Sequence, residues 1–353
     1  MVKQLSVEEF LRKAEQLPVI DVRSPGEYNH AHIPGAVSVP LFDNDERAQV
    51  GTKYKNAGKD AAVLLGLDLV GPKLSGFVKK AKKLNPQQKE VLVHCWRGGM
   101  RSGSFAWLLD TAGLTASTLV GGYKAYRNAV IAAFSEPRQL LILGGKTGSG
   151  KTDVLHELAR QGEQVIDLEG LAHHKGSSYG AIGQLPQPAT EHFENLLFAK
   201  WRTLDPNRRI WLEDESRNVG SCFIPLPLWG QMRTAPVAFL DVPKEVRIKR
   251  LVTEYTGIDH KLLIEATERI RKRLGGKVTK DALDALDRHD YAAVADLTLD
   301  YYDKAYLHGL LQRDSATVHP FPIQEDAPDQ TAQQLIAWAN SRSEHKSEIV
   351  SIS

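Results

Sequence analysis

The feature that most constrains the fold is the run GKTGSGKT, which fits the pattern G-x-x-x-x-G-K-[ST]. The apolar segment RQLLILGG precedes it, and the helix-forming segment DVLHELARQG follows it. In that setting the glycines let backbone N–H groups surround phosphate oxygens, Lys151 adds a positive charge, and Thr152 can ligate Mg²⁺. This order predicts an α/β domain with a parallel sheet, although a purely structural glycine-rich turn is the alternative. The predicted phosphate-binding or diphosphate-binding residues are Gly145, Lys146, Thr147, Gly148, Ser149, Gly150, Lys151 and Thr152.

Short apolar strands alternate with helices in two stretches of the chain. The first stretch has strand-like segments at residues 17–22, 36–40, 90–95 and 117–123. The second restarts near Glu136-Pro137, with segments at 138–145, 163–168, 208–214 and 235–241. Strands that are apolar nearly throughout are typical of parallel sheets covered on both faces. We therefore predict two α/β domains.

The predicted boundaries follow from where these patterns change. The first domain covers residues 1–136 and carries an insertion at about 42–90, because that stretch is long for a connection and contains helix-forming runs. The second covers 137–320 and is mostly helical after residue 257. Residues 321–353 are predicted to be a C-terminal tail.

Cysteine usage and hydropathy bear on the compartment. Two cysteines, Cys95 and Cys222, are too few for a disulfide framework in 353 residues, so we expect the reducing cytoplasm. No window approaches the uninterrupted apolar length that a membrane span needs, so no membrane partner is expected. The first 16 residues predict a helix capped by Ser6 and Glu9, not a signal peptide.

The segment HCWRGGMRSGS places Cys95 between an apolar strand and a predicted helix. A thiol at a helix N-terminus faces free backbone N–H groups and a partial positive charge, and Arg97 and Arg101 add full charges, so the pattern favours a nucleophilic thiolate. Gly98 and Gly99 let the backbone curl into an anion-binding loop. The alternative is a buried structural cysteine. Cys222 has apolar neighbours and is predicted to be inert.

Two further charged segments each allow more than one prediction. Glu213, Asp214 and Glu215 end a predicted strand, where Glu213 or Asp214 could join Thr152 in holding Mg²⁺, or where all three could simply be solvated. Between Lys244 and Lys280 there are eleven Lys or Arg residues against five Asp or Glu, an excess of six positive charges. This excess predicts either a polyanion contact or a solvated helix face.

The first half resembles a rhodanese domain, because IDVRSPGEYNHAHIPGA looks like that family's opening signature and the Cys95 loop stands at its active-site position. Five residues separate Cys95 from Arg101, where most sulfurtransferase rhodaneses have four; this longer loop is similar to that of the cell-cycle phosphatases with the same fold. From the residues alone, sulfur transfer and phosphate ester cleavage both stay open.

From about residue 17 to about 310 the chain resembles the bacterial tRNA 2-selenouridine synthases. Eight stretches carry the resemblance, in order: NDERAQVGTKYKNAGKDAA, CWRGGMRS, GGYKAYR, GGKTGSGKT, DLEGLAHHKGSSYG, FENLLF, WLEDESRNVGS and YYDKAY. It implies an α/β chain in which a rhodanese-like parallel-sheet domain precedes a P-loop NTPase-like α/β domain with a helical C-terminal part. The region after EVRIKRLVTEY is shorter than in some relatives.

The resemblance also implies the activity, which is a transferase reaction on tRNA. The sulfur of 2-thiouridine at the wobble position is geranylated with geranyl diphosphate and then replaced by selenium from selenophosphate. Cys95, with Arg97 and Arg101, is implied to carry selenium, the P-loop to bind the diphosphate with Mg²⁺, and a selenophosphate-supplying synthetase to be a possible partner. Arg269, Arg271 and Arg273 are the predicted tRNA-binding residues, and the aromatic candidates for stacking the base are Tyr179, Phe193, Trp211 and Tyr255.

Three other functions remain open from the sequence. One is a rhodanese-fused small-molecule kinase or nucleotidase, which would turn over ATP without tRNA. A second is a rhodanese-fold cysteine phosphatase, which would cleave an artificial aryl phosphate. The third is an RNA-binding regulator in which both loops sense anions.

Overall fold

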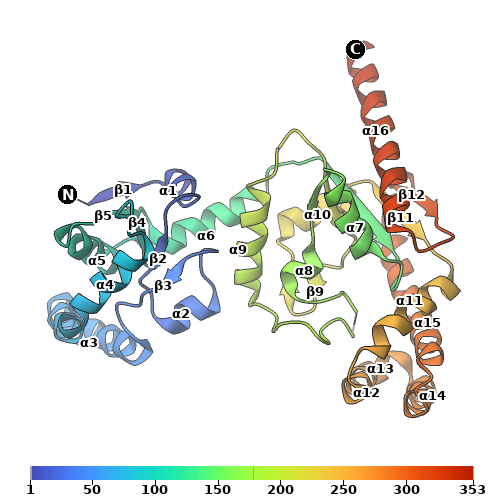
Figure 1. The fold of residues 1–353 in the computed structure, drawn as a ribbon, viewed down its shortest axis with the longest axis horizontal. Helices are drawn as coiled ribbons and strands as arrows, with labels where there is room; N and C mark the ends of the chain where they lie inside the picture. The colour runs from blue at the N-terminus through green and yellow to red at the C-terminus, as the bar shows by residue number, and fades with distance from the viewer. Residues whose placement is uncertain (1, 178, 353) are drawn as a thin grey trace. The chain divides into compact units, whose positions relative to one another are not determined.

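The computed structural model describes residues 2–177 and 179–352, with side chains described as far as Arg342. The chain divides into two compact units, shown in Figure 1, and each is described by itself. Unit 1 consists of Met1–Ala133 and Glu194–Ala199, and unit 2 of Phe134–Phe193 and Lys200–Ser353. The predicted boundary at 136–137 lies close to this division, whereas the membership of residues 194–199 was not predicted.

Unit 1 is built on a parallel five-stranded sheet in the order β1-β5-β4-β2-β3. Its strands are β1 (Lys3–Leu5), β2 (Val19–Asp21), β3 (Val37–Ser38), β4 (Glu90–His94) and β5 (Thr115–Leu119). The four predicted strands are confirmed. The predicted N-terminal helix is shorter than expected, because residues 3–5 form β1, and α1 (Val7–Lys13) then starts at the Ser6–Glu9 capping box.

The helices of unit 1 include the predicted insertion. They are α1, α2 (Pro25–His30), α3 (Asn44–Val70), the 3₁₀ turn η1 (Gly71–Lys73), α4 (Leu74–Leu84), α5 (Met100–Thr111) and α6 (Gly122–Ala133). Residues 42–90 therefore form helices α3 and α4, and Gly58, with φ +81°, kinks α3. By length and composition alone the helical run Asn44–Leu84 could cross a membrane, although Asp60, Asp68 and Lys73 interrupt its apolar sequence.

Unit 2 contains a parallel sheet in the order β12-β11-β6-β8-β7 and a two-stranded antiparallel ribbon, β9–β10. The strands are β6 (Leu140–Gly145), β7 (Gln164–Ile166), β8 (Ile210–Glu213), β9 (Asn218–Val219), β10 (Cys222–Phe223), β11 (Val237–Asp241) and β12 (Val318–Pro322). The helices beside this sheet are α7 (Lys151–Arg160), α8 (Leu168–Ala172), α10 (Leu226–Thr234) and α16 (Pro328–Ile352). Helix α9 (Thr190–Trp201) is divided between the units, since its residues 194–199 belong to unit 1.

The prediction of a C-terminal tail at 321–353 is wrong. Strand β12 closes one edge of the sheet, where its prolines are tolerated because an edge strand leaves one row of N–H positions unpaired. Helix α16 follows, and its Ala332, Leu335 and Ala339 lie in the same hydrophobic core as residues of α7. These residues are therefore part of unit 2.

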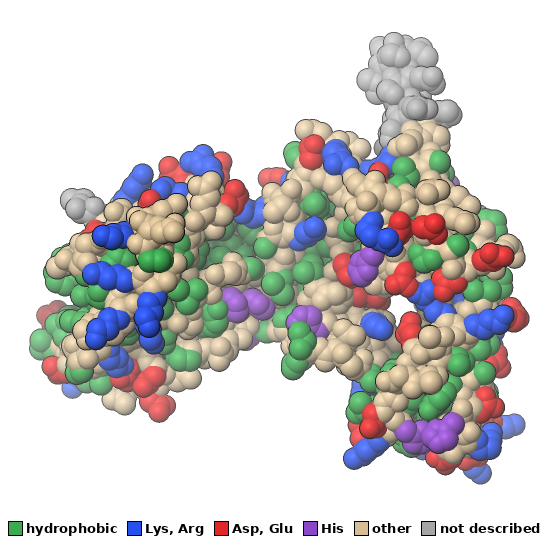
Figure 2. All heavy atoms as spheres, in the orientation of Figure 1, with side chains coloured by type: hydrophobic (Ala, Val, Ile, Leu, Met, Phe, Trp, Pro, Cys, Tyr) green, Lys and Arg blue, Asp and Glu red, His purple; other side chains and the backbone are tan. Residues whose placement is uncertain are grey.

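A helical part of unit 2 confirms the prediction made for the residues after 257. It comprises α11 (Lys244–Thr256), α12 (His260–Arg269), α13 (Arg271–Leu274), α14 (Gly276–Asp287) and α15 (Tyr291–Leu310), with the 3₁₀ turn η2 (Ser315–Thr317) after it. These helices have a hydrophobic core of their own, which includes Leu251, Leu263 and Leu299. Figure 2 shows a hollow between this helical part and the sheet part of unit 2.

Candidate functional sites

Cys95 follows β4 directly, and α5 begins five residues later, so the structure places the thiol at a helix N-terminus as predicted. The side chain is buried, with 3% of it exposed. Its Sγ lies 3.2 Å from the hydroxyl oxygen of Ser102, which is fully buried in the first turn of α5. Gly99, the N-cap residue of α5, has no side chain that could accept a hydrogen bond, so no capping side chain occupies the first N–H groups of the helix.

Gly98 of CWRGG and Gly122 of GGYKAYR shape this loop. A Cβ on Gly98 would lie 2.5 Å from the Leu119 carbonyl oxygen, and one on Gly122 would lie 2.4 Å from the Cys95 carbonyl oxygen. Both glycines have positive φ, +65° and +60°. The N–H of Tyr123 then donates to the Cys95 carbonyl at 2.8 Å. The GGYKAYR segment therefore packs closely against the Cys95 loop. This close contact explains why both GGYKAYR and CWRGG contain glycines.

The net positive charge around Cys95 is smaller than the sequence indicated, because one of its two arginines is paired with an acid. Arg97 is exposed, but Arg101 donates from Nη1 to Glu27 Oε2 at 3.0 Å. Burial tends to raise the pKa of Glu27, yet Arg101 and the N–H of Ser24 hold that pKa below its ordinary value. Glu27 and Ser102 were both missed from sequence: Glu27 lies in another segment, and Ser102 lies within HCWRGGMRSGS but was given no role.

A buried ionic group lies at the end of the same sheet. Arg23 donates to Asp21 through Nε and Nη2, at 2.7 Å for Nη2–Oδ2, and its guanidinium lies 3.8 Å from the ring centroid of Tyr123. Burial lowers the pKa of His94 to about 4, so this residue is neutral beside Asp21 near pH 7. The group fixes the end of β2 and the first turn of α6 against the Cys95 loop.

The phosphate-binding loop joins β6 to α7, as predicted, and Gly150 before the helix has φ +78°. Lys151 Nζ donates to the Gly145 carbonyl at 2.9 Å, which holds the ammonium group over the loop. The hydroxyl of Thr152 donates to Glu169 Oε2 at 3.0 Å. Loop, lysine and threonine thus come together at one helix N-terminus, where an anion is stabilised.

The three acids after β8 have separate positions. Glu213 is fully buried and accepts a hydrogen bond from the Leu168 N–H at 3.0 Å; burial raises its pKa well above the ordinary value. Asp214 accepts from Arg313 at 2.5 Å and from the Tyr306 hydroxyl at 2.9 Å. The two candidates named for Mg²⁺ therefore have other partners.

Glu215 lies beside the loop together with Glu169, which the sequence did not reveal. Burial and the neighbouring Glu169 carboxylate raise the pKa of Glu215 well above its ordinary value, while Lys151 opposes that rise. Gly176, with φ +67°, lets the backbone approach both acids, since a Cβ there would lie 2.5 Å from Glu169 Oε1. Within the described residues no group of three acidic, histidine or cysteine side chains is arranged as a metal site.

A cavity of about 550 Å³ extends from this loop. One wall consists of the loop itself with Glu169 and Glu215, and the other comes from the helical part and the segment after α8. Of the four aromatic candidates, Tyr179 and Tyr255 border this cavity, whereas Phe193 and Trp211 are fully buried in the core. The volume is typical of a site for a small organic ligand.

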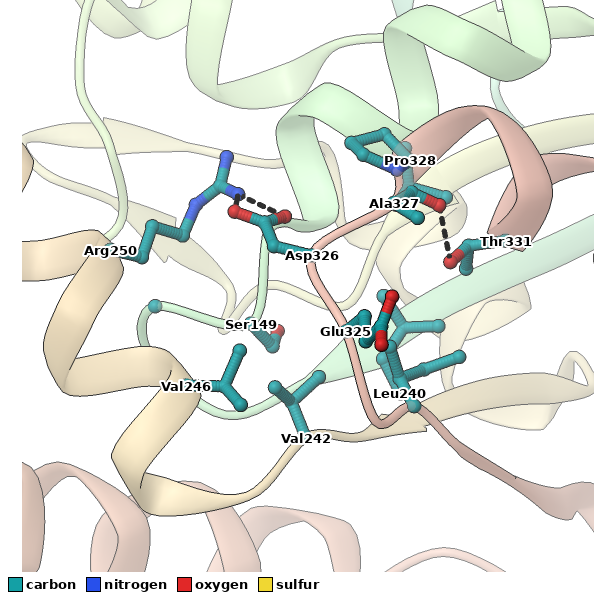
Figure 3. A pocket seen from close by; sticks show the side chains of 13 residues that line it. Ser149, Leu240, Val242, Val246, Arg250, Glu325, Asp326, Ala327, Pro328 and Thr331 are labelled. Atoms are coloured by element: carbon teal, nitrogen blue, oxygen red, sulfur yellow. Dashed lines mark hydrogen bonds and ion pairs between the residues drawn. The ribbon is translucent and has the colours of Figure 1, made fainter.

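Arg250 of α11 is a further residue that the sequence did not single out. It pairs with Asp153 of α7 and donates to Asp326 at 2.6 Å, and Figure 3 shows this pair above Ser149 of the loop. The enclosed space beneath it is about 10 Å³, at the lower limit for one water molecule. Arg250 also lines the large cavity, so it lies at the phosphate end of that space.

The predicted tRNA-binding arginines lie around α12 and α13. Arg269, Arg271 and Arg273 are exposed, and Arg271 forms an ion pair with Glu268. Elsewhere in the basic segment, Lys244, Arg247 and Arg250 pair with acids of other elements. Part of the charge excess therefore stabilises the fold of unit 2.

The second cysteine contrasts with the first. Cys222 is fully buried, and its Sγ lies 3.4 Å from the Pro188 carbonyl oxygen. Burial raises the pKa of this thiol to about 11, in agreement with the prediction that it is inert.

The folds and the two loops define a protein class in which a rhodanese-like unit is joined to a P-loop α/β unit. Residues 6–129 match the model of the rhodanese-like domain, and residues 138–334 match that of the tRNA 2-selenouridine synthase AAA domain. The chain therefore belongs to the tRNA 2-selenouridine synthase family.

Two individual relatives agree with this assignment. The tRNA 2-selenouridine synthase of Pseudomonas syringae pv. syringae is 34% identical over 372 residues, covering 94% of this chain and 96% of the relative. That of Nitrosomonas europaea is 37% identical over 250 residues, covering 67% of this chain; the match spans 63% of the relative's own length. Among solved structures, a rhodanese-related protein from Thermoplasma volcanium is 16% identical, with TM-score 0.23, covering 36% of this chain and 92% of that one.

Proposed function

We propose that this chain is a tRNA-modifying transferase that converts wobble 2-thiouridine to 2-selenouridine. The observation that supports it is that one chain of this family carries both a cysteine at the N-terminus of α5 and a phosphate-binding loop at the N-terminus of α7. The two loops suit two different anions, one carried on sulfur and one bound by amides and lysine. Cytoplasmic location and supply of selenophosphate by a partner synthetase go with this proposal.

The first proposed step is geranylation at the phosphate-binding loop. The sulfur of 2-thiouridine attacks the first carbon of geranyl diphosphate, the carbon–oxygen bond breaks, and pyrophosphate leaves with the electron pair. The base loses its N3 proton, so the S-geranyl product is neutral. Lys151 and the loop N–H groups stabilise the charge that develops on the leaving group.

The second proposed step replaces sulfur by selenium. Alkylation makes the C2 carbon electrophilic and turns the sulfur into a departing thiol. Cys95 holds selenium as an S-selanyl adduct, which forms when a small-molecule disulfide takes two electrons from the thiolate and the selenide-level selenium of selenophosphate, while water takes up the phosphoryl group as phosphate. The selenium attacks C2, and geranylthiol leaves. Two small-molecule thiols then reduce the bond between Cys95 Sγ and selenium, which re-forms the disulfide and releases the 2-selenouridine. The exposed Arg97 and the uncapped start of α5 lie where they stabilise the selanyl anion.

Magnesium fits the donors beside the phosphate-binding loop. Thr152, Glu169 and Glu215 supply hydroxyl and carboxylate oxygens, the hard ligands that Mg²⁺ takes, and a cation there would favour the ionised form of both acids. When bound, the ion would neutralise charge on the diphosphate. These residues replace Glu213 and Asp214 as the proposed ligands, because the latter are already hydrogen-bonded elsewhere.

Variants of the two loops test the division of labour. Cys95→Ala should still geranylate 2-thiouridine RNA but yield no 2-selenouridine. Lys151→Ala should lose geranylation by roughly a hundredfold or more, because a charge on the leaving pyrophosphate is worth a few kcal/mol. Each variant is given 2-thiouridine RNA or RNA already geranylated, and the digested nucleosides are separated and weighed by mass spectrometry. Loss of geranylation in folded Cys95→Ala would show that the loops do not act separately.

The competing functions have distinct outcomes in simple assays. ATP turnover without RNA would favour a kinase or nucleotidase, and cleavage of an aryl phosphate that depends on Cys95 would favour a phosphatase. Binding of tRNA with no modified nucleoside would favour a regulator.

A further inference from the structure

The cavity beside the phosphate-binding loop is lined by two chemically different sets of groups. One set is the N–H groups of the loop, Lys151 and Thr152. The other set is carbon-rich side chains from α11 and the turn after it, from α15 and from the segment after α8; Lys175 and Glu254 also line the cavity there. The carbon-rich side chains, which we name the apolar wall, are Tyr179, Ile182, Leu251, Tyr255, Ile258 and Tyr302.

Two tyrosines of the apolar wall have their hydroxyl groups bonded within the helical part. The Tyr179 hydroxyl lies 2.9 Å from Thr267 Oγ1, and the Tyr255 hydroxyl is hydrogen-bonded to Thr298. Their ring centroids are 5.3 Å apart. Because both hydroxyl groups are already hydrogen-bonded within the helical part, the surface that the two rings present to the cavity is apolar.

The carbon-rich part of this cavity favours an alkyl diphosphate over a nucleotide. A nucleoside base would leave ring nitrogens against carbon, which costs free energy unless they are hydrogen-bonded. A hydrocarbon chain gains free energy from the same contact.

We propose that the apolar wall binds the prenyl chain and that Tyr179 and Tyr255 limit the chain length accepted. The proposal rests on the geranylation proposed above, and it assigns the specificity of that step to named residues. The loop would hold the diphosphate whatever the chain length, so specificity changes at the wall should leave diphosphate binding intact.

The test compares dimethylallyl, geranyl and farnesyl diphosphates as donors to 2-thiouridine RNA. Tyr179→Ala or Tyr255→Ala removes about seven non-hydrogen atoms, more than the about five carbons that farnesyl adds. The ratio of kcat/KM for farnesyl over geranyl should rise by about tenfold or more. Tyr179→Phe keeps the ring and should keep the wild-type ratio. Tyr291→Ala removes a ring from the same hydrophobic core outside the cavity and serves as the control.

The farnesyl-to-geranyl ratio of kcat/KM compares two donors on the same variant, so a smaller fraction of folded protein does not change this ratio. Ile258→Trp fills the cavity instead of enlarging it, and it should shift preference toward dimethylallyl diphosphate. Unchanged ratios in the alanine and tryptophan variants would overturn the assignment of the wall while leaving geranylation standing. No alkylation by wild-type protein with any donor would instead overturn the proposed function, and this inference with it.

A second observation, independent of the first, is the charge on the insertion of unit 1. From Lys53 to Lys89 there are nine lysines against two aspartates, an excess of seven. Lys73 pairs with Glu46; within the described residues the other eight show no ion pair and are exposed. We name as the lysine face the exposed residues Lys53, Lys55, Lys59, Lys79, Lys80, Lys82, Lys83 and Lys89.

Helix α4 shows how this face is presented. Phe77 and Ala81 pack into the core of unit 1, and the lysines at 79, 80, 82 and 83 lie on the exposed side. In the basic segment of unit 2, by contrast, Lys244, Arg247 and Arg250 are paired. We infer that the lysine face contacts the phosphate backbone of the tRNA. This inference rests on tRNA being the substrate.

The test replaces Lys79, Lys80, Lys82 and Lys83 by Glu and measures tRNA binding against salt concentration. The slope of log affinity against log salt should become shallower by about 0.7 to 0.9 for each phosphate that the variant no longer neutralises. The fourfold Lys→Arg variant keeps the charge and should keep the wild-type slope. A wild-type slope in the Glu variant would overturn the inference, as would binding of anionic phospholipid vesicles by this face with unaltered tRNA binding. Failure of wild-type protein to bind tRNA would count against the proposed function itself.

Discussion

Gly122→Ala tests the packing that shapes the Cys95 loop. Gly122 has φ +60°, and a Cβ on it would lie 2.4 Å from both the Cys95 carbonyl oxygen and the Gly98 nitrogen. Both are backbone atoms of the anion loop, so neither can rotate away as the end of a side chain would. The loop or the start of α6 must move for alanine to fit.

The expected cost combines two terms. A non-glycine residue with left-handed backbone angles costs about 1–2 kcal/mol. Forcing extra volume into a close-packed contact costs about 1–3 kcal/mol more. A sum of about 2–5 kcal/mol is a large part of the usual stability of a domain, about 5–15 kcal/mol. At about 3 °C per kcal/mol, we expect unit 1 to stay folded but to melt roughly 6–15 °C lower, with the hydrogen bond from Tyr123 N–H to the Cys95 carbonyl weakened.

Calorimetry and thiol alkylation measure the two consequences, stability and loop geometry. Gly103→Ala is the matched control, because Gly103 lies inside α5 with nothing within 4 Å of its Cβ position. That change should be neutral or stabilise by up to about 1 kcal/mol, since alanine is the better helix former. If Gly122→Ala melted within about 1 °C of wild type and its Cys95 reacted at an unchanged rate, close packing of the two glycine turns would not shape the loop.

Three further outcomes are expected. Alkylation at neutral pH followed by peptide mass spectrometry should modify Cys95, at the start of α5, faster than Cys222, whose pKa burial raises to about 11; equal labelling would contradict this. Burial raises the pKa of Glu213. The stability that the neutral carboxyl group contributes is therefore fully present below the ordinary carboxyl pKa of 4.5 and is lost as pH rises through the raised pKa. Glu213→Gln should therefore gain stability over wild type by about 1–3 kcal/mol at pH 8 and less at pH 5 in urea unfolding, and an equal difference at both pH values would refute that sign. Replacing Arg269, Arg271 and Arg273 by Glu should weaken tRNA binding and flatten its salt dependence, and an unchanged slope would leave them as a solvated face.

Sequence patterns predicted what depends on neighbours along the chain. Apolar runs identified the inner strands of both sheets, and glycine patterns identified both anion loops. The strands that were missed are β1, β12 and the ribbon β9–β10; of these, β1 and β12 are edge strands whose pairing partners β5 and β11 are far away in sequence. Their residues alone carry too little apolar pattern to reveal a strand.

The site residues that were missed share the same cause. Glu27 reaches Arg101 from 74 positions away, and Arg250 reaches Asp326 from 76 positions away. Glu169 stands 17 residues after Thr152, in the stretch DLEGLAHHKGSSYG, which carries the family resemblance but did not single out this acid. A local motif predicts that a loop binds an anion, but only the fold shows which distant acids and bases set the charge around it.

The three acids after β8 show why a motif alone could not select the metal ligand. Glu213 is the last residue of the strand, and its side chain meets the Leu168 N–H in the interior. Asp214 is held by Tyr306 and Arg313, which come 92 and 99 residues later, and Arg313 also donates to the Met232 carbonyl. Asp214 therefore anchors the end of α15 to the sheet. With both preceding acids engaged in this way, the geometry favours Glu215 as the carboxylate of this run that meets a cation at the phosphate-binding loop.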